Sequence, residues 1–152
     1  MLQKGSHKGL FHATHPDKYL GDAKNIVYRS SWELKLFRYC DLTPGVIKWA
    51  SEEFHIPYLS PVDKRMHRYF PDVYMQVRTT DGSIKHSVIE IKPKVQTLPP
   101  KASRKRNRRF LSETMTYAVN QAKWEAATAY CKVKGWTFMV VNETHLGIPK
   151  HR

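Results

Sequence analysis

Two carboxylates and a lysine stand in an arrangement suited to phosphate chemistry. Asp72 follows a proline, and Glu90-Ile91-Lys92 comes one β-rich run later. Residues two apart on a strand share a face, so Glu90 and Lys92 should project together while Ile91 points the other way. The carboxylates and the Ile91 carbonyl are the oxygen ligands that Mg²⁺ or Mn²⁺ takes, and such a metal activates water for phosphodiester hydrolysis.

Lys92 could orient or deprotonate that water and offset charge on the phosphate. The alternative is a surface salt bridge in which Glu90 and Lys92 are ordinary strand-end charges. The run Ser87 to Lys92 is otherwise apolar, and charge in a buried strand is costly without a partner or a use. This context favours the functional interpretation.

A β-hairpin is needed to bring Asp72 beside Glu90. The runs Tyr69 to Arg78 and Lys85 to Lys92 flank Thr80-Asp81-Gly82-Ser83, and an Asp-Gly pair between β-rich runs is a strong hairpin signal. The two strands are therefore predicted to be antiparallel partners. Pro93 should end the second strand, because proline cannot donate to the ladder.

A helix and two short strands are predicted before this hairpin. Ser30 is a good N-cap, and Glu33 stands at the capping-box position of a helix that ends at Thr43-Pro44-Gly45. Val46 to Ala50 and Phe54 to Tyr58 are short β candidates.

A long helix and a final strand are predicted after the hairpin. The helix should span Ser112 to Lys134, and Trp136 to Val141 reads as a buried strand, parallel to a neighbour if the helix is a crossover. The predicted packing face of the helix is a small-residue stripe of Met115, Ala118, Ala122, Ala126, Ala129 and Val133. The fold class is thus α/β, a sandwich with a central mixed β-sheet flanked by helices.

The chain is predicted to form one catalytic domain with flanking segments. Residues 1–27 are polar and basic and read as an irregular arm; residues 28–145 form the domain, with an Arg-rich insertion at 99–110; residues 146–152 form a C-terminal tail. No long apolar run or signal peptide is evident, so no membrane partner is expected. Cys40 and Cys131 are expected to be buried thiols.

The charge balance points to a polyanionic partner. The chain has 26 Lys and Arg against 13 Asp and Glu, a formal net charge of +13, which favours nucleic acid. No recognition helix is evident, so little sequence specificity is expected. Backbone contacts to double-stranded DNA are assigned to the basic run Lys101, Arg104, Lys105, Arg106, Arg108 and Arg109.

These motifs together resemble a known superfamily. Pro71-Asp72 followed by Glu90-Ile91-Lys92 looks like the PD-(D/E)xK motif of the restriction-endonuclease-like nucleases, whose core order fits the predicted elements. Tyr28 to Glu33 followed by the strand pair is similar to the TnsA-like group. In size, basic arm and Arg-rich insertion the chain resembles the head-completion nucleases of myovirus-type tailed phages.

The resemblance implies roles for two further residues. A helical glutamate completes the metal site in TnsA-like proteins, and Glu33 is the matching position; the alternative is that Glu33 only caps its helix. A helix glutamine followed by an aromatic residue supports the site in related nucleases, and Gln121 is the candidate. Here the aromatic Trp124 comes one place early, so the alternative for Gln121 is an ordinary solvent-facing residue.

The function implied is a Mg²⁺- or Mn²⁺-dependent deoxyribonuclease that processes packaged DNA in the host cytoplasm before head–tail joining. Phage head and portal-vertex proteins are its implied partners, and it could stay associated with the virion. The rival hypothesis is a non-catalytic, DNA-binding virion protein that keeps the fold without the chemistry. A ribonuclease is a third alternative.

Overall fold

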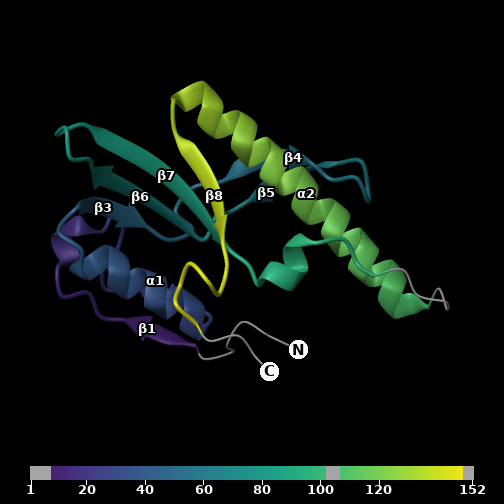
Figure 1. Cartoon of the computed structure of the whole chain (residues 1–152), viewed down its shortest axis with the longest axis horizontal. Helices are drawn as coiled ribbons and strands as arrows, with labels where there is room; N and C mark the ends of the chain where they lie inside the picture. The colour runs from purple at the N-terminus through teal and green to yellow at the C-terminus, as the bar shows by residue number, and fades with distance from the viewer. Residues whose placement is uncertain (1–7, 102–106, 149–152) are drawn as a thin grey trace.

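A four-stranded mixed sheet forms the centre of the protein (Figure 1). The computed structural model describes residues 8–101 and 107–148. The strand order is β3 (Val46–Ala50), β6 (Val73–Arg78), β7 (Ile84–Ile91) and β8 (Thr137–Val141), antiparallel except for the last pair. The mixed sheet and its parallel final strand were both predicted from the sequence, and both are confirmed.

The β6–β7 hairpin has the predicted turn. Val73 pairs with Ile89 and Arg78 with Ile84. In the turn, Gly82 has a φ of 87°, a conformation that side chains disfavour, and the Asp81 carboxylate accepts hydrogen bonds from the backbone N–H and the hydroxyl of Ser83. These bonds fix the register and therefore the position of both strand ends.

The first predicted strand of this hairpin is divided in two. Tyr69, expected on the Asp72 strand, ends β5 (Met66–Tyr69), which pairs with β4 (Ile56–Leu59) in a separate two-stranded sheet. Pro71 interrupts the run because it has no N–H to donate. The chain therefore bends between Tyr69 and Asp72.

The crossover helix α2 (Arg108–Lys134) begins four residues earlier than predicted. Asn107 caps it by accepting a hydrogen bond from the Phe110 N–H, and Gly135 closes it in the left-handed conformation. Asparagine's strength as an N-cap outweighs the expected loop character of the basic run. Arg108 and Arg109 therefore lie on the helix.

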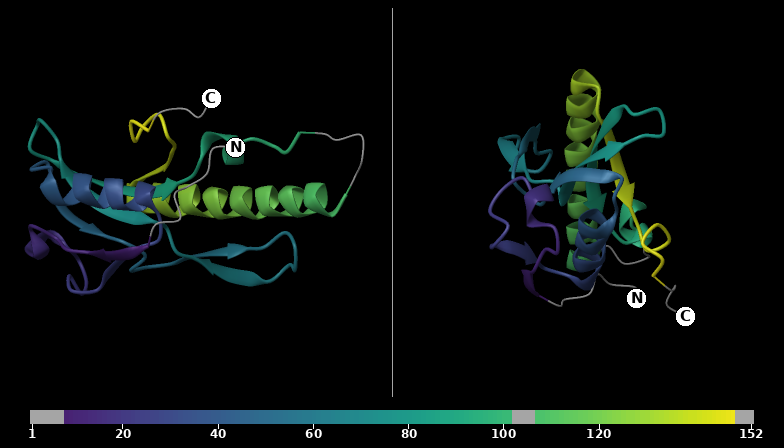
Figure 2. Two further views of the ribbon diagram at one scale, coloured as in Figure 1. Left: turned by 90° about the horizontal axis from the view of Figure 1, so that it is seen from below. Right: turned by 90° about the vertical axis from the view of Figure 1, so that its left-hand side faces the viewer.

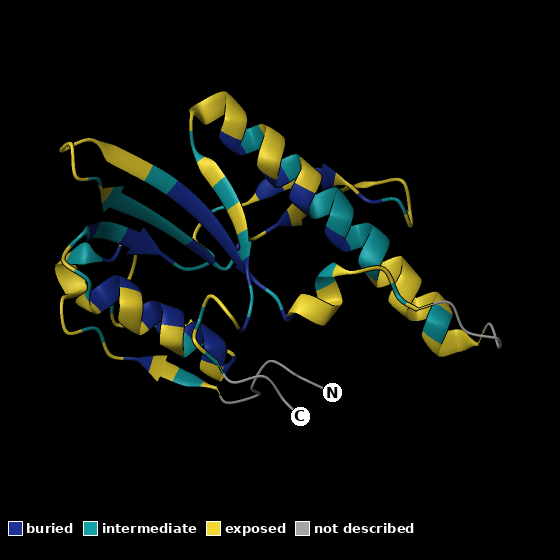
Figure 3. Cartoon of the chain, in the orientation of Figure 1, coloured by how far each residue is buried: buried dark blue, intermediate teal, exposed yellow. Residues whose placement is uncertain are grey.

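The packing face of α2 also differs from the prediction. Asn120, Trp124, Ala127 and Cys131 are buried, whereas Val133 is 88% exposed. Burying one tryptophan removes far more apolar surface from water than burying several alanines does, so the helix turns Trp124 inward against β4 and β8. Beyond the end of the sheet, the first turns of α2 project away and are largely exposed (Figures 2 and 3).

The opposite face of the sheet is covered by α1 (Ser31–Leu42) and the N-terminal segment. Phe37 and Trp49 lie at the centre of this core. The expectation of irregular structure fails for the described part of residues 1–27: β1 (Gly9–Phe11) pairs with β2 (Ile26–Tyr28), and a short 3-10 helix, η1 (Pro16–Lys18), lies between them. Apolar alternation over three-residue strands was too short to detect.

A buried carboxylate ties this segment to α1. Asp41 is 2% exposed, and its two oxygens accept hydrogen bonds from the backbone N–H groups of Thr14 and His15, at 2.8 and 2.9 Å. Both cysteines are buried thiols, as predicted, and burial raises the pKa of Cys40 to about 12. Within the described residues, no helix is long and apolar enough to span a membrane.

Candidate active site

Asp72 and the Glu90–Lys92 triplet meet where β6 begins and β7 ends. The Ile91 N–H donates to Asp72 Oδ2 at 2.7 Å. This bond ties the aspartate directly to the backbone between Glu90 and Lys92. The antiparallel pairing of Val73 with Ile89 brings the two chain segments side by side, so the convergence expected from the hairpin is present.

Glu90 and Lys92 project from the same side of β7. Lys92 Nζ lies 3.6 Å from Glu90 Oε2, and the two side chains are 21% and 11% exposed. The Tyr69 hydroxyl donates to Glu90 Oε1 at 2.7 Å. The glutamate is therefore held between a phenol and an ammonium group in a site that admits little solvent.

The pKa of Tyr69 is affected by the negative charges of this site. Its pKa is raised well above the usual value, chiefly by burial and further by the neighbouring charges of Glu90 and Asp72. The phenol consequently stays protonated and continues to donate to Glu90 across the physiological pH range.

The donor set suits a hard divalent cation. Carboxylate oxygens are the ligands that Mg²⁺ and Mn²⁺ prefer, and Mg²⁺ commonly takes only one or two carboxylates alongside waters and substrate phosphates. Asp72, Glu90 and the Ile91 carbonyl can supply that protein share. Across residues 8–101 and 107–148, no three His, Cys, Asp or Glu side chains cluster closely enough to hold a metal, so Glu33 does not join the two carboxylates in one such cluster.

Glu33 lies in the first turn of α1 and is 4% exposed. Its N–H donates to the N-cap Ser30 Oγ at 3.1 Å, as predicted, and its Oε1 accepts from the Arg29 N–H at 3.3 Å. Ser30 therefore caps α1 as predicted, and the Glu33 carboxylate binds the backbone of the residue before the N-cap. This end of α1 also faces the end of the sheet where β6 begins (Figure 1), and a role in metal binding stays a prediction.

The remaining predicted residues are spread along α2 and the segment before it. Gln121 is half-buried, and Lys101, Arg108 and Arg109 are exposed. Arg109 forms an ion pair with Glu113 at 2.9 Å. The predicted DNA-binding residues Arg104, Lys105 and Arg106 lie outside the described residues.

Two neighbours of the site escaped the sequence-based prediction. Tyr69 was assigned to the Asp72 strand, and only its place in Tyr69-Phe70-Pro71-Asp72 could have signalled a supporting role. Lys123 on α2 places its Nζ 5.7 Å from the centre of the Tyr69 ring and 5.9 Å from that of Tyr58, within cation–π range. Nothing in the local sequence around Lys123 indicates this long-range contact.

Comparison with known proteins agrees with this geometry. A family model described as "TnsA-like endonuclease N terminal" matches residues 43–143. The chain belongs to this endonuclease family. Its matched region includes Asp72, Glu90 and Lys92 and begins after Glu33. The fold is accordingly of the restriction-endonuclease-like α/β class predicted from the sequence.

A curated relative covers nearly the whole chain. The head completion nuclease of Enterobacteria phage T4 is 36% identical over 145 residues, which span 93% of this chain and 94% of the relative. Similarity at this level extends beyond the family match and includes the segment around Glu33.

Proposed function

We propose that the protein is a divalent-metal-dependent deoxyribonuclease that acts on packaged DNA during phage head completion, before head–tail joining. The observation that carries the proposal is the convergence of Asp72, Glu90 and Lys92 at paired strand ends. Membership of the TnsA-like endonuclease family supports the reaction class. The biological setting rests on the relative named for head completion.

Each of these residues has a distinct task in this proposal. Mg²⁺ or Mn²⁺ held by Asp72, Glu90 and the Ile91 carbonyl would polarise the scissile phosphate and acidify an attacking water. The Ile91 N–H fixes the Asp72 carboxylate, so that its orientation does not depend on substrate. Lys92 places a cation where it can orient or deprotonate water and offset charge developing on phosphorus.

Glu33 and Gln121 are proposed to support this site from α1 and α2. Glu33 is buried in the first turn of α1, where a carboxylate also interacts favourably with the helix dipole. Gln121 comes one residue after the buried Asn120. Neither is needed to complete the Asp72–Glu90 pair, so both are expected to tune activity more than to determine it.

The net charge of +13 suits a DNA substrate bound through its backbone. We assign phosphate contacts to the basic run 101–109 and propose low sequence specificity, because neither α1 nor α2 is presented as a base-reading element. A nuclease that cuts packaged DNA would act in the host cytoplasm, with phage head and portal-vertex proteins as its partners. If it stays bound to the head after assembly, it would be retained in the virion.

Plasmid nicking in Mg²⁺ or Mn²⁺ tests the enzyme proposal. Asp72→Asn removes a charged oxygen ligand but keeps the shape of the side chain, and should lower nicking by at least about 100-fold. Asp17→Asn is the matched control, because Asp17 is exposed on η1, far in sequence from the site. It should behave like the wild type.

Three other results would redirect the proposal. Equal nicking by all three proteins would mean that a contaminating nuclease is responsible. DNA binding without metal-dependent nicking by the wild type would favour the rival, a non-catalytic DNA-binding head protein. An RNA substrate cleaved in preference to DNA would replace the deoxyribonuclease with a ribonuclease.

A further inference from the structure

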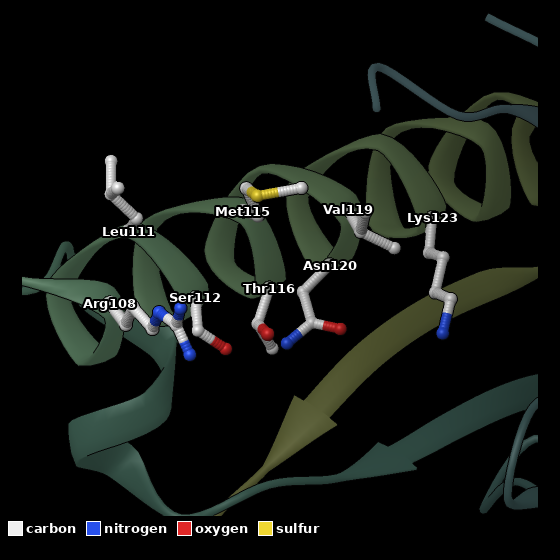
Figure 4. Close-up of a pocket in the computed structure, with 8 residues that line it drawn as sticks. All are labelled: Arg108, Leu111, Ser112, Met115, Thr116, Val119, Asn120 and Lys123. Carbon is white, nitrogen blue, oxygen red and sulfur yellow. The ribbon is translucent and has the colours of Figure 1, made fainter. Parts of the chain in front are cut away.

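A groove of about 490 Å³ runs along the first half of α2. Figure 4 shows that several of its lining side chains point from the helix toward the region where β7 and β8 end. The groove is lined by Arg108, Leu111, Ser112, Met115, Thr116, Val119, Asn120 and Lys123. None of these residues is acidic.

The polar members of this lining have a regular spacing. Arg108, Ser112, Thr116 and Asn120 are four residues apart and form one row on the helix (Figure 4). An α-helix rises 1.5 Å per residue, so neighbours in the row are about 6 Å apart along the axis. That interval is close to the separation of successive phosphates in a nucleic-acid strand. The row therefore offers one donor group per phosphate.

The hydroxyl groups of this row are not used by the helix itself. Thr114 and Thr128 donate to the carbonyls of Phe110 and Trp124, one turn earlier. No such bond from Ser112 or Thr116 occurs in the described part of the chain. Their hydroxyls are thus available to a ligand in the groove.

Asn120 adds a third neutral donor to the row. It is only 8% exposed, and its amide lies beside Thr116 on the groove side of the helix (Figure 4). An amide that faces the groove can donate two hydrogen bonds to a ligand there. A phosphate oxygen in the groove would supply an acceptor.

The charges at the two ends of the groove are positive. Arg108 stands at the outer end and Lys123 at the inner end. Arg109 is different, because its guanidinium is paired with Glu113. Two adjacent arginines of the same basic run thus have different environments, and only Arg108 lines the groove.

The inner end of the groove adjoins the candidate active site. Lys123 Nζ lies over the Tyr69 ring at 5.7 Å, and the Tyr69 hydroxyl donates to Glu90. A strand lying along the groove would therefore lead to the carboxylates. The apolar residues Leu111, Met115 and Val119 line the same groove and suit the sugar and base faces that flank the phosphates.

We propose that this groove binds the sugar–phosphate backbone of the DNA strand that is cut, with Arg108 contacting the phosphate farthest from the scissile bond and Lys123 one close to it. Ser112, Thr116 and Asn120 contact the phosphates between them. This assignment takes its substrate, DNA, from the proposed function. Within the basic run 101–109, it singles out Arg108 as the residue that contacts the cut strand along the groove.

Fluorescence anisotropy with a labelled DNA duplex of random sequence, in EDTA, tests the groove separately from cleavage. Arg108→Ala should weaken binding about five- to tenfold and reduce the slope of log affinity against log salt by about one. Arg109→Ala removes the same charge from the next residue, whose guanidinium is already paired with Glu113, and should weaken binding clearly less than Arg108→Ala does. Arg108→Lys should restore most of the salt slope.

The uncharged hydrogen-bond donors of the groove allow a second, independent test in the same binding experiment. Thr116→Val removes the hydroxyl at nearly constant shape and should weaken binding about two- to fivefold without altering the salt slope. Thr114→Val is its control, because that hydroxyl already bonds within the helix. Thermal melts would identify any variant that loses affinity by unfolding.

The results separate this inference from the proposed function. Equal losses in Arg108→Ala and Arg109→Ala, or none in either, would overturn the groove assignment even if plasmid nicking is robust. If DNA binding depends on the groove residues but the wild type does not nick DNA in Mg²⁺ or Mn²⁺, the groove assignment would be retained and the nuclease proposal refuted. Absence of duplex binding by the wild type would overturn the groove assignment whatever the nicking result.

Discussion

The strand-end site and the α2 groove differ in how their residues are held. Glu90 is 8% exposed and bonded to a buried tyrosine, whereas Leu111 in the groove is 54% exposed and the first turns of α2 project beyond the sheet. Chemistry at a phosphate requires fixed atoms, while backbone binding requires mainly charge and spacing. Substitutions in the first region should therefore lower turnover, and those in the second should lower affinity.

The sharpest test of this contrast is Lys92→Met. It keeps the length of the side chain but removes the ammonium beside Glu90, and should lower nicking by about 100- to 10,000-fold with duplex affinity changed less than about twofold. Lys94→Met is the control, since Lys94 is exposed just beyond the strand. A parallel loss of affinity and turnover would remove the distinction between the regions.

Glu33→Gln should have the next largest effect. The amide can still accept from the Arg29 N–H, so the helix cap survives while the negative charge is lost; nicking should fall about 10-fold or more if Glu33 supports metal binding. Ser30→Ala is the reciprocal variant and should lower the free energy of unfolding by about 1 kcal/mol. If Glu33→Gln nicks DNA as fast as the wild type at every metal concentration, the role of Glu33 would be limited to the start of the helix.

Tyr69→Phe should have a smaller effect on turnover and a measurable one on stability. Losing the donor to Glu90 should lower nicking about three- to tenfold and the free energy of unfolding by about 1–3 kcal/mol. Tyr58→Phe is the control, because Tyr58 faces the same Lys123 but is not bonded to Glu90. Equal losses in both variants would indicate general packing.

The same tyrosine predicts a pH dependence of stability. The Tyr69 pKa is raised in the folded state, so the folded chain holds this proton more tightly than the unfolded chain does. Its contribution to stability is complete below about pH 10 and is lost as pH rises above that value. Denaturant unfolding from pH 8 to 11 should show a shallower decline in Tyr69→Phe than in the wild type.

The smallest expected effect concerns the Arg109–Glu113 ion pair. Both side chains are at least half exposed, and exposed pairs one turn apart on a helix contribute about 0.3–0.5 kcal/mol. A double-mutant cycle on the thermal midpoint should give coupling within that range. A larger coupling would mean that the pair contributes more to helix stability than an exposed contact should.

Local signals predicted the strand-end site because each depends on neighbours in sequence. The Asp-Gly turn fixes the β6–β7 register, and alternation along β7 puts Glu90 and Lys92 on one side. Signals that depend on distant contacts failed: the buried face of α2 was misassigned, and β1 and β2 were missed. Their packing is decided by Trp124 against β4 and by Asp41 bonding the backbone of Thr14 and His15.

The sequence by itself determined the hairpin, the mixed sheet and the pairing of two carboxylates with a lysine, because turn chemistry and a two-residue period act over short distances. Only the tertiary structure decided that Tyr69 holds Glu90, that Lys123 reaches Tyr69, and that Arg108 lines the groove while Arg109 pairs with Glu113. Those relations follow from how the bend at Pro71 and the rotation of α2 bring separate elements together, and no local pattern encodes them.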